Sequence, residues 1–169
     1  MRGSVRILLW CDTEFRPGQH RTPWQAAAVA QCADGSCITT YDRGRIKGQQ
    51  LTAAQITEFQ RILGAFAGGR RPGLVCCWGV PERWHIQEAG VDMDDYADVL
   101  AGFRTLFPQV KPSAAESPMS FAMDVLRWVF GFSLEHAHEA AQDCHDTSAI
   151  VLLLLRATIR YCEEHDVEL

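Results

Sequence analysis

Two acidic side chains, Asp12 and Glu14, follow an apolar run near the start of the 169-residue chain. The run, residues 5–11, is rich in β-branched and large apolar side chains and predicts a buried strand. Because the acids are two residues apart, an extended strand projects them from the same side. Such a pair resists ionisation unless a cation lies close by, and Mg²⁺ and Mn²⁺ favour oxygen ligands. The alternative is that the strand simply ends in polar residues where it reaches solvent. This stretch alone does not distinguish a metal-binding pair from such a strand end.

One further acidic residue follows a second predicted strand, and another stands at the start of the last predicted helix. Residues 73–79 are predicted to form a second buried strand, and Glu82 comes shortly after it. Asp143 stands where the last helix is predicted to begin, and there the helix dipole favours a carboxylate. His138 lies five residues earlier in a predicted loop. By itself it is compatible with a surface histidine, since other histidines are close by.

The composition, 47% hydrophobic and 22% charged residues, is that of a soluble globular chain. The length predicts a single domain over residues 1–169, with residues 1–4 as a disordered leader. The net charge of −5 gives no overall attraction to nucleic acid, so a nucleic-acid site must be a local basic patch assisted by metal. Seven cysteines without a C-x-x-C pair favour buried reduced thiols in a cytoplasmic protein. We expect no signal peptide and no membrane-spanning segment.

The remaining pattern predicts a hairpin and four helices. Two apolar runs, 26–32 and 36–41, flank an Asp-Gly pair, which is a strong hairpin signal. Thr52 and Gln55 form a capping box at the start of a helix over 52–67. Apolar spacing predicts further helices over residues 96–107, 118–130 and 143–162. The last is apolar on more than one face and is expected to be well buried, and the core is predicted to include Trp10, Trp78 and Trp128.

This order of elements implies a mixed β-sheet with helices packed against it, an α/β layered domain. Ligands collect at the carboxyl ends of the strands in such sheets, and Asp12 and Glu82 both fall at such ends. Basic side chains in predicted loops either face phosphate or are simply solvated: Arg16, His20, Arg21, Arg43, Arg45, Lys47, Arg70 and Arg71.

The acidic pair, the later acid and the H-x-x-x-x-D pattern together resemble the DEDDh 3'-to-5' exonucleases. Three stretches carry the resemblance: Trp10–Phe15, Cys77–Arg83 and His138–Thr147. The Trp-Gly pair before the middle acid resembles the pattern of one subgroup, which includes the RNA-interference-regulating and histone-mRNA exoribonucleases. The resemblance covers nearly the whole chain and implies a ribonuclease H-like fold, a mixed β-sheet flanked by α-helices.

The resemblance also implies a role for each polar residue. Asp12, Glu14 and Asp143 would hold one divalent metal ion, Mg²⁺ or Mn²⁺, and Asp12 with Glu82 would hold a second. His138 would be the general base that takes a proton from the attacking water. The ordinary pKa of a histidine, about 6.5, suits that role.

Thr13 and Phe15 would contact the substrate. Phe15 would stack on the terminal base, although a core phenylalanine is an equal alternative. The implied reaction releases nucleoside 5'-monophosphates from single-stranded or short nucleic acid, with RNA slightly favoured over DNA. The same resemblance implies that the chain can form a homodimer.

The sequence departs from the family at the middle acid, where Glu82 replaces the usual aspartate. A misplacement of about 1 Å can cost on the order of 10²-fold in rate. All four implied ligands remain carboxylates, so we expect retained activity. The alternatives are a nucleic-acid-binding or scaffold protein with an exonuclease fold and impaired catalysis, and an unrelated α/β domain in which the four carboxylates do not converge.

Overall fold

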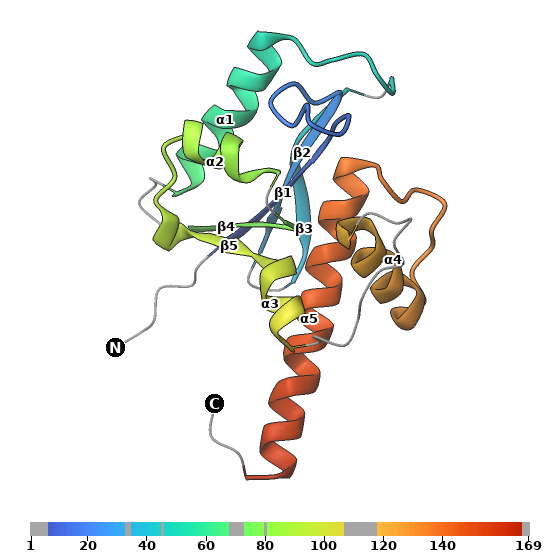
Figure 1. The fold of residues 1–169 in the computed structure, drawn as a ribbon. Coiled ribbons are helices and arrows are strands. Elements are labelled where there is room, and N and C mark those ends of the chain that lie inside the picture. The colour runs from blue at the N-terminus through green and yellow to red at the C-terminus, as the bar shows by residue number, and fades with distance from the viewer. Residues whose placement is uncertain are drawn as a thin grey trace.

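Five strands form one mixed sheet in the order β3-β2-β1-β4-β5 (Figure 1). The computed structural model describes residues 7–32, 35–44, 46–67, 73–79, 81–106 and 118–166. β1 pairs antiparallel with β2 and parallel with β4, so the acid-bearing strand lies at the centre. The predicted mixed α/β architecture is therefore confirmed. The strands are β1 (Ile7–Glu14), β2 (Gln25–Gln31), β3 (Cys37–Arg43), β4 (Gly73–Cys77) and β5 (Tyr96–Asp98).

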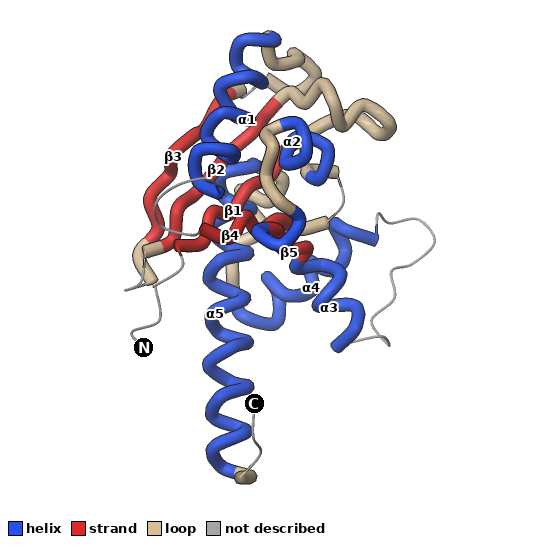
Figure 2. The backbone as a smooth tube through the Cα atoms, turned by 90° about the vertical axis from the view of Figure 1, so that its left-hand side faces the viewer, coloured by secondary structure: helices blue, strands red, loops and turns tan. Residues whose placement is uncertain are grey.

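Helices cover both faces of this sheet, as Figures 1 and 2 show. α1 (Ala53–Ala67) and α2 (Arg83–Glu88) lie against one face. α5 (Ala140–Glu164) lies against the other, with α4 (Pro118–Phe130) packed on it, and α3 (Val99–Leu106) follows β5 directly.

The alternation of side chains along β1 decides which of them meet which helix. Leu9 and Cys11 pack in the apolar cluster beneath α1. Trp10 points to the other face and packs with Ala140 and Cys144 of α5. By the same two-residue period, the acidic side chains that follow Trp10 at even positions project toward the α5 side.

The predicted capping box and hairpin are both confirmed. The Thr52 N–H donates to Gln55 Oε1 at 2.9 Å, and the Gln55 N–H donates to Thr52 Oγ1 at 3.3 Å. β2 and β3 pair antiparallel, from Gln31 opposite Cys37 onward. All seven cysteines are free; five are buried, whereas Cys32 and Cys37 are half-buried.

Several helix predictions are wrong in part. Residues 96–98 belong to β5 and not to a helix, because they pair in parallel with residues 75–77 of β4. α3 therefore begins at Val99, where the Asp98 carboxylate accepts the Ala101 N–H at 3.1 Å. Neither α2 nor the 3₁₀ helix at Met93–Asp95 was predicted. The last helix begins three residues before Asp143 and ends at Glu164.

The prediction that the last helix is well buried is also wrong for its C-terminal half, which extends past the sheet (Figures 1 and 2). A helix of 25 residues is about 37 Å long, whereas the eight residues of β1 span about 27 Å. The sheet is too short to cover the whole helix, and Leu155 and Tyr161 are 51% and 58% exposed. Trp128 is 78% exposed on α4 and is not a core residue, whereas Trp10 and Trp78 are buried as predicted.

Some predicted features lie outside the described residues. They are the leader at residues 1–4, Asp34 of the hairpin turn, Arg45, the helix end at residues 68–69, Arg70, Arg71 and the connection over residues 111–117. Of the helices that the structure describes, none has the length and apolar character needed to cross a membrane.

Burial predicts which leucines stabilise this fold. Leu63 of α1 is fully buried in the cluster beneath that helix, so Leu63→Ala should lower the free energy of unfolding by about 2–5 kcal/mol. Leu155→Ala removes the same atoms from an exposed position and should cost less than about 1 kcal/mol. Urea unfolding followed by circular dichroism measures both. Equal losses would contradict the assignment of the core.

Candidate metal centre

A cleft of about 340 Å³ opens at the carboxyl ends of β1 and β4. β1, the turn that follows β4, α4 and the start of α5 all contribute side chains to its walls. All of the site residues that the sequence predicts line this one cleft: Asp12, Thr13, Glu14, Phe15, Glu82, His138 and Asp143.

The sheet explains why residues from distant parts of the chain meet here. β1 and β4 run parallel with Cys11 opposite Cys77, so the residues that follow each strand emerge at the same edge. Asp12 follows Cys11 directly, and Glu82 lies in the turn that leads into α2. Asp143 comes from the first turn of α5, the helix that faces the same side of β1 as Trp10.

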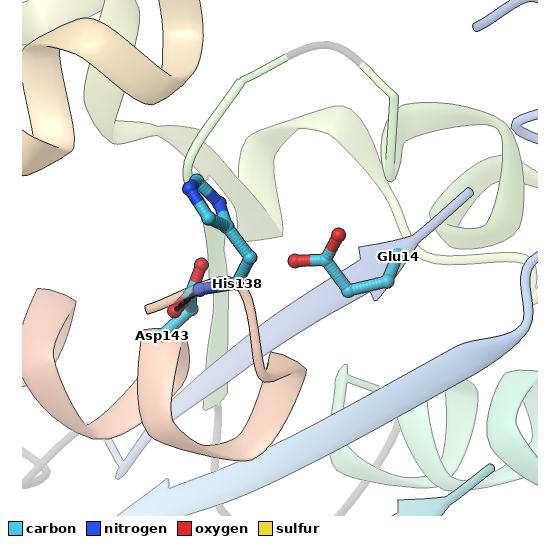
Figure 3. A group of neighbouring side chains, drawn as sticks. All are labelled: Glu14, His138 and Asp143. Carbon is cyan, nitrogen blue, oxygen red and sulfur yellow. Dashed lines mark hydrogen bonds between the residues drawn. The ribbon is translucent and has the colours of Figure 1, made fainter. Parts of the chain in front are cut away.

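Glu14, His138 and Asp143 form the tightest group of candidate ligands in the described part of the chain (Figure 3). One ligand atom from each lies within 4.8 Å of the others. Asp12 and Glu82 line the cleft but are not members of this group. A cation between the Glu14 and Asp143 carboxylates would therefore lie close to the His138 imidazole.

Two of the carboxyl groups that line the cleft each have an oxygen without a hydrogen-bond partner in the part of the chain that the structure describes. Asp12 Oδ2 and Glu82 Oε2 are buried and have no hydrogen-bond partner among the described residues. Glu82 is only 2% exposed, and its other oxygen, Oε1, accepts the Thr13 hydroxyl at 2.7 Å. A buried carboxylate oxygen without a partner is costly. The set of four carboxylates therefore fits a divalent cation such as Mg²⁺ or Mn²⁺.

Burial also makes the carboxyl groups resist ionisation. Burial, together with the neighbouring carboxyl groups of Asp143 and Glu82, raises the pKa of Glu14 to about 8. Burial raises the pKa of Glu82 to about 7, although the hydrogen bond from Thr13 acts in the opposite sense. The pKa values of Asp12 and Asp143 are raised by burial as well. The centre is thus a set of acids that lacks sufficient positive charge.

Arg127 of α4 supplies a positive charge that the sequence analysis missed. Its side chain is fully buried. Nε donates to Asp146 Oδ2 at 2.7 Å, and Nη2 donates to Asp143 Oδ1. The sequence shows Arg127 only as a single arginine among the apolar residues of the predicted helix. This does not reveal its partners, because they are set by the packing of α4 on α5.

His138 has an unusual backbone. Its φ of +68° is in the left-handed region, which costs a residue other than glycine about 1 kcal/mol or more. The His138 N–H donates to Asp143 Oδ1 at 3.1 Å, which helps to hold this conformation. Strain of this kind is concentrated at functional sites.

Thr13 and Phe15 differ in their surroundings. Thr13 is 4% exposed, and its hydroxyl is engaged with Glu82. Phe15 is half-buried on the cleft wall, with its ring edge-on to His20 at 6.5 Å between centroids. It belongs to none of the apolar clusters among the described residues, which favours a place on the rim over a core role. Substrate contact by either residue stays a prediction.

Neither the family models nor the curated proteins with which the sequence was compared match it. The exonuclease assignment therefore stays a prediction from the motifs, and the geometry of the cleft carries the functional argument.

The raised pKa values predict how stability depends on pH without metal. In the unfolded chain a glutamate titrates near 4.3, whereas Glu14 and Glu82 titrate near 8 and near 7 in the folded protein. Between these values the folded state binds more protons, so the free energy of unfolding should fall as the pH rises from about 4.5 to 8.

A divalent cation should reverse that loss. A ligand at 100 times its Kd stabilises by about 2.7 kcal/mol, so saturating Mn²⁺ should raise Tm by roughly 5–10 °C at pH 8. At pH 5, where protons occupy the carboxyl groups, the rise should be small. Thermal unfolding with Mn²⁺ or EDTA measures this, with Glu14→Gln beside the exposed control Glu163→Gln. An undiminished Mn²⁺ effect in Glu14→Gln would count against the centre.

Proposed function

We propose that this chain is a metal-dependent 3'-to-5' exonuclease that acts on single-stranded or short nucleic acid. The observation that carries the proposal is the convergence of four carboxyl groups and one histidine on a single cleft. The strand order, with only β2 antiparallel to its neighbours, is compatible with a ribonuclease H-like fold. The preference for RNA over DNA rests on the subgroup resemblance of the motifs.

The carboxylates Asp12, Glu14, Glu82 and Asp143 would hold two divalent ions, whose chemistry is to neutralise the phosphodiester and to stabilise developing negative charge. Thr13 donates to Glu82 Oε1, whereas Oε2 has no hydrogen-bond partner among the described residues and is the oxygen left for a cation.

His138 takes a proton from the water that attacks the terminal phosphorus. A new bond forms between that water oxygen and phosphorus, and the bond from phosphorus to the 3' oxygen of the preceding nucleotide breaks. The products are a nucleoside 5'-monophosphate and a chain one nucleotide shorter, whose 3' oxygen takes up a proton.

The size of the cleft supports action at a chain end. About 340 Å³ lies at the lower end of the range for small-molecule sites, which suits one terminal nucleotide better than a duplex. Phe15 on the wall supplies an aromatic face for its base. Because the net charge is −5, attraction of the substrate depends on the bound cations and on local basic residues.

A second candidate function is supported by the environment of Glu82. Its carboxylate is buried and already accepts a hydrogen bond from Thr13, and it is one methylene longer than the aspartate of the family. A protein in which this group is misplaced would bind metal and nucleic acid but hydrolyse slowly.

Degradation of a 5'-labelled single-stranded RNA and of a matching DNA tests the proposal. We expect a ladder that shortens from the 3' end with Mn²⁺ or Mg²⁺ and is abolished by EDTA. Asp12→Asn should reduce the rate by at least about 10²-fold, because it removes a buried ligand, whereas the exposed control Asp94→Asn should not.

Two outcomes separate the candidates. Cleavage that appears only in Glu82→Asp would favour the binding protein with impaired catalysis. Absence of cleavage in both the folded wild-type protein and Glu82→Asp would contradict the exonuclease proposal.

A further inference from the structure

Four residues form a closed loop of contacts beside the candidate metal centre. Arg127 donates to Asp143 Oδ1 and, from Nη1, to Asp124 Oδ1 at 3.4 Å. Asp124 Oδ2 lies 4.0 Å from His138 Nε2, and the His138 N–H closes the loop on Asp143 Oδ1 at 3.1 Å. Two residues of α4 thus hold the two predicted functional residues of the segment that leads into α5.

Arg127 is the fixed point of this loop of contacts. Its guanidinium is fully buried and tied through Nε to Asp146, which also accepts a hydrogen bond from Gln142 at 2.7 Å. The planar fork of a guanidinium holds carboxylates in defined directions. Asp124, one helical turn before Arg127, is thereby held on the side of α4 that faces His138.

His138 needs such a partner. Its side chain is 52% exposed, so neighbouring side chains hold only part of the imidazole in place. A histidine that acts as a base depends on a third group to fix its orientation and its tautomer. Because Nε2 faces Asp124, that nitrogen is placed to donate, and Nδ1 remains as the acceptor.

Stability does not explain the contact between Asp124 and His138. Their side chains are 38% and 52% exposed, and ion pairs this accessible to solvent contribute little to the free energy of unfolding. The pair also lies next to the strained backbone of His138. Strain of this kind is concentrated at functional sites, where an ordered imidazole would serve catalysis.

We propose that Asp124 is a positioning residue for His138, and that Arg127 holds Asp124 in place. The inference rests on the proposed function of His138 as the general base. The Asp124 carboxylate lies 4.0 Å from Nε2 and accepts the Nε2–H when the two groups close to hydrogen-bond distance, which keeps the imidazole directed toward the cleft. During hydrolysis the proton of the attacking water moves to Nδ1, the Nε2–H stays bonded to Asp124, and Asp124 itself takes no proton.

The first test is independent of nuclease activity. Carbon-13 relaxation gives the order parameter of the His138 Cε1–H bond in histidine-labelled protein without metal. We expect a value near 0.8 in the wild-type protein and below about 0.6 in Asp124→Ala, with Asp124→Asn in between. The control Glu135→Gln removes a carboxylate from the loop that carries His138 and should leave the value unchanged. Equal values for wild type and Asp124→Ala would overturn the inference.

The second test separates kcat from KM on the RNA substrate. Asp124→Ala should lower kcat about tenfold, a part of the 10²- to 10⁴-fold that general-base catalysis contributes, with KM within twofold. In a His138→Ala background the same change should have no further effect, because Asp124 acts through His138. A tenfold loss that persists without His138 would overturn the inference. A wild-type protein that does not cleave would contradict the proposed function, and the order parameter alone would then decide the role of Asp124.

Discussion

The cost of placing four carboxyl groups around one buried cleft is the constraint on which this site depends. Asp12 and Glu82 each leave a buried oxygen without a partner among the described residues, and burial together with the neighbouring carboxyl groups raises the pKa of Glu14 to about 8. Apolar residues of similar volume would stabilise a purely structural core at least as well. Arg127 offsets one negative charge. Protons neutralise the remaining charge at low pH, and we propose that divalent cations do so at higher pH, which would connect the architecture to its chemistry.

The fold meets that requirement by bringing together three distant parts of the chain. The parallel pairing of β1 with β4 places Asp12 and the turn that holds Glu82 at one edge of the sheet. α5 packs on the face of β1 that carries Trp10 and so delivers Asp143 to the same place. α4 contributes no predicted ligand, but its Arg127 and Asp124 connect the acid at the start of α5 with His138.

Features that depend on local chemistry could be predicted from the sequence. The period of two along β1 places Asp12 and Glu14 on one side, and the Thr52–Gln55 box marks the start of α1. Features that depend on distant partners could not. Residues 96–98 form a strand only because β4 lies beside them, and the exposure of Leu155 follows from the length of the sheet.

The same distinction applies within the site. The acidic residues and His138 are recognisable from residue type and spacing, because the metal chemistry that we propose uses those types. Arg127 and Asp124 have no such signature, since their roles arise from the packing of α4 against α5. Their partners lie at sequence separations of 14 to 19 residues on another element.

Anomalous diffraction from crystals grown with Mn²⁺ tests most directly whether this cleft is a metal centre. Data collected at the manganese absorption edge should show an anomalous peak in the cleft, bonded to oxygens of Asp12, Glu14 and Asp143. The peak should be lost in Asp12→Asn crystals that keep the same fold. Ordered carboxylates with no anomalous density in the cleft, at Mn²⁺ concentrations that occupy other sites in the crystal, would contradict a metal-dependent function for this protein.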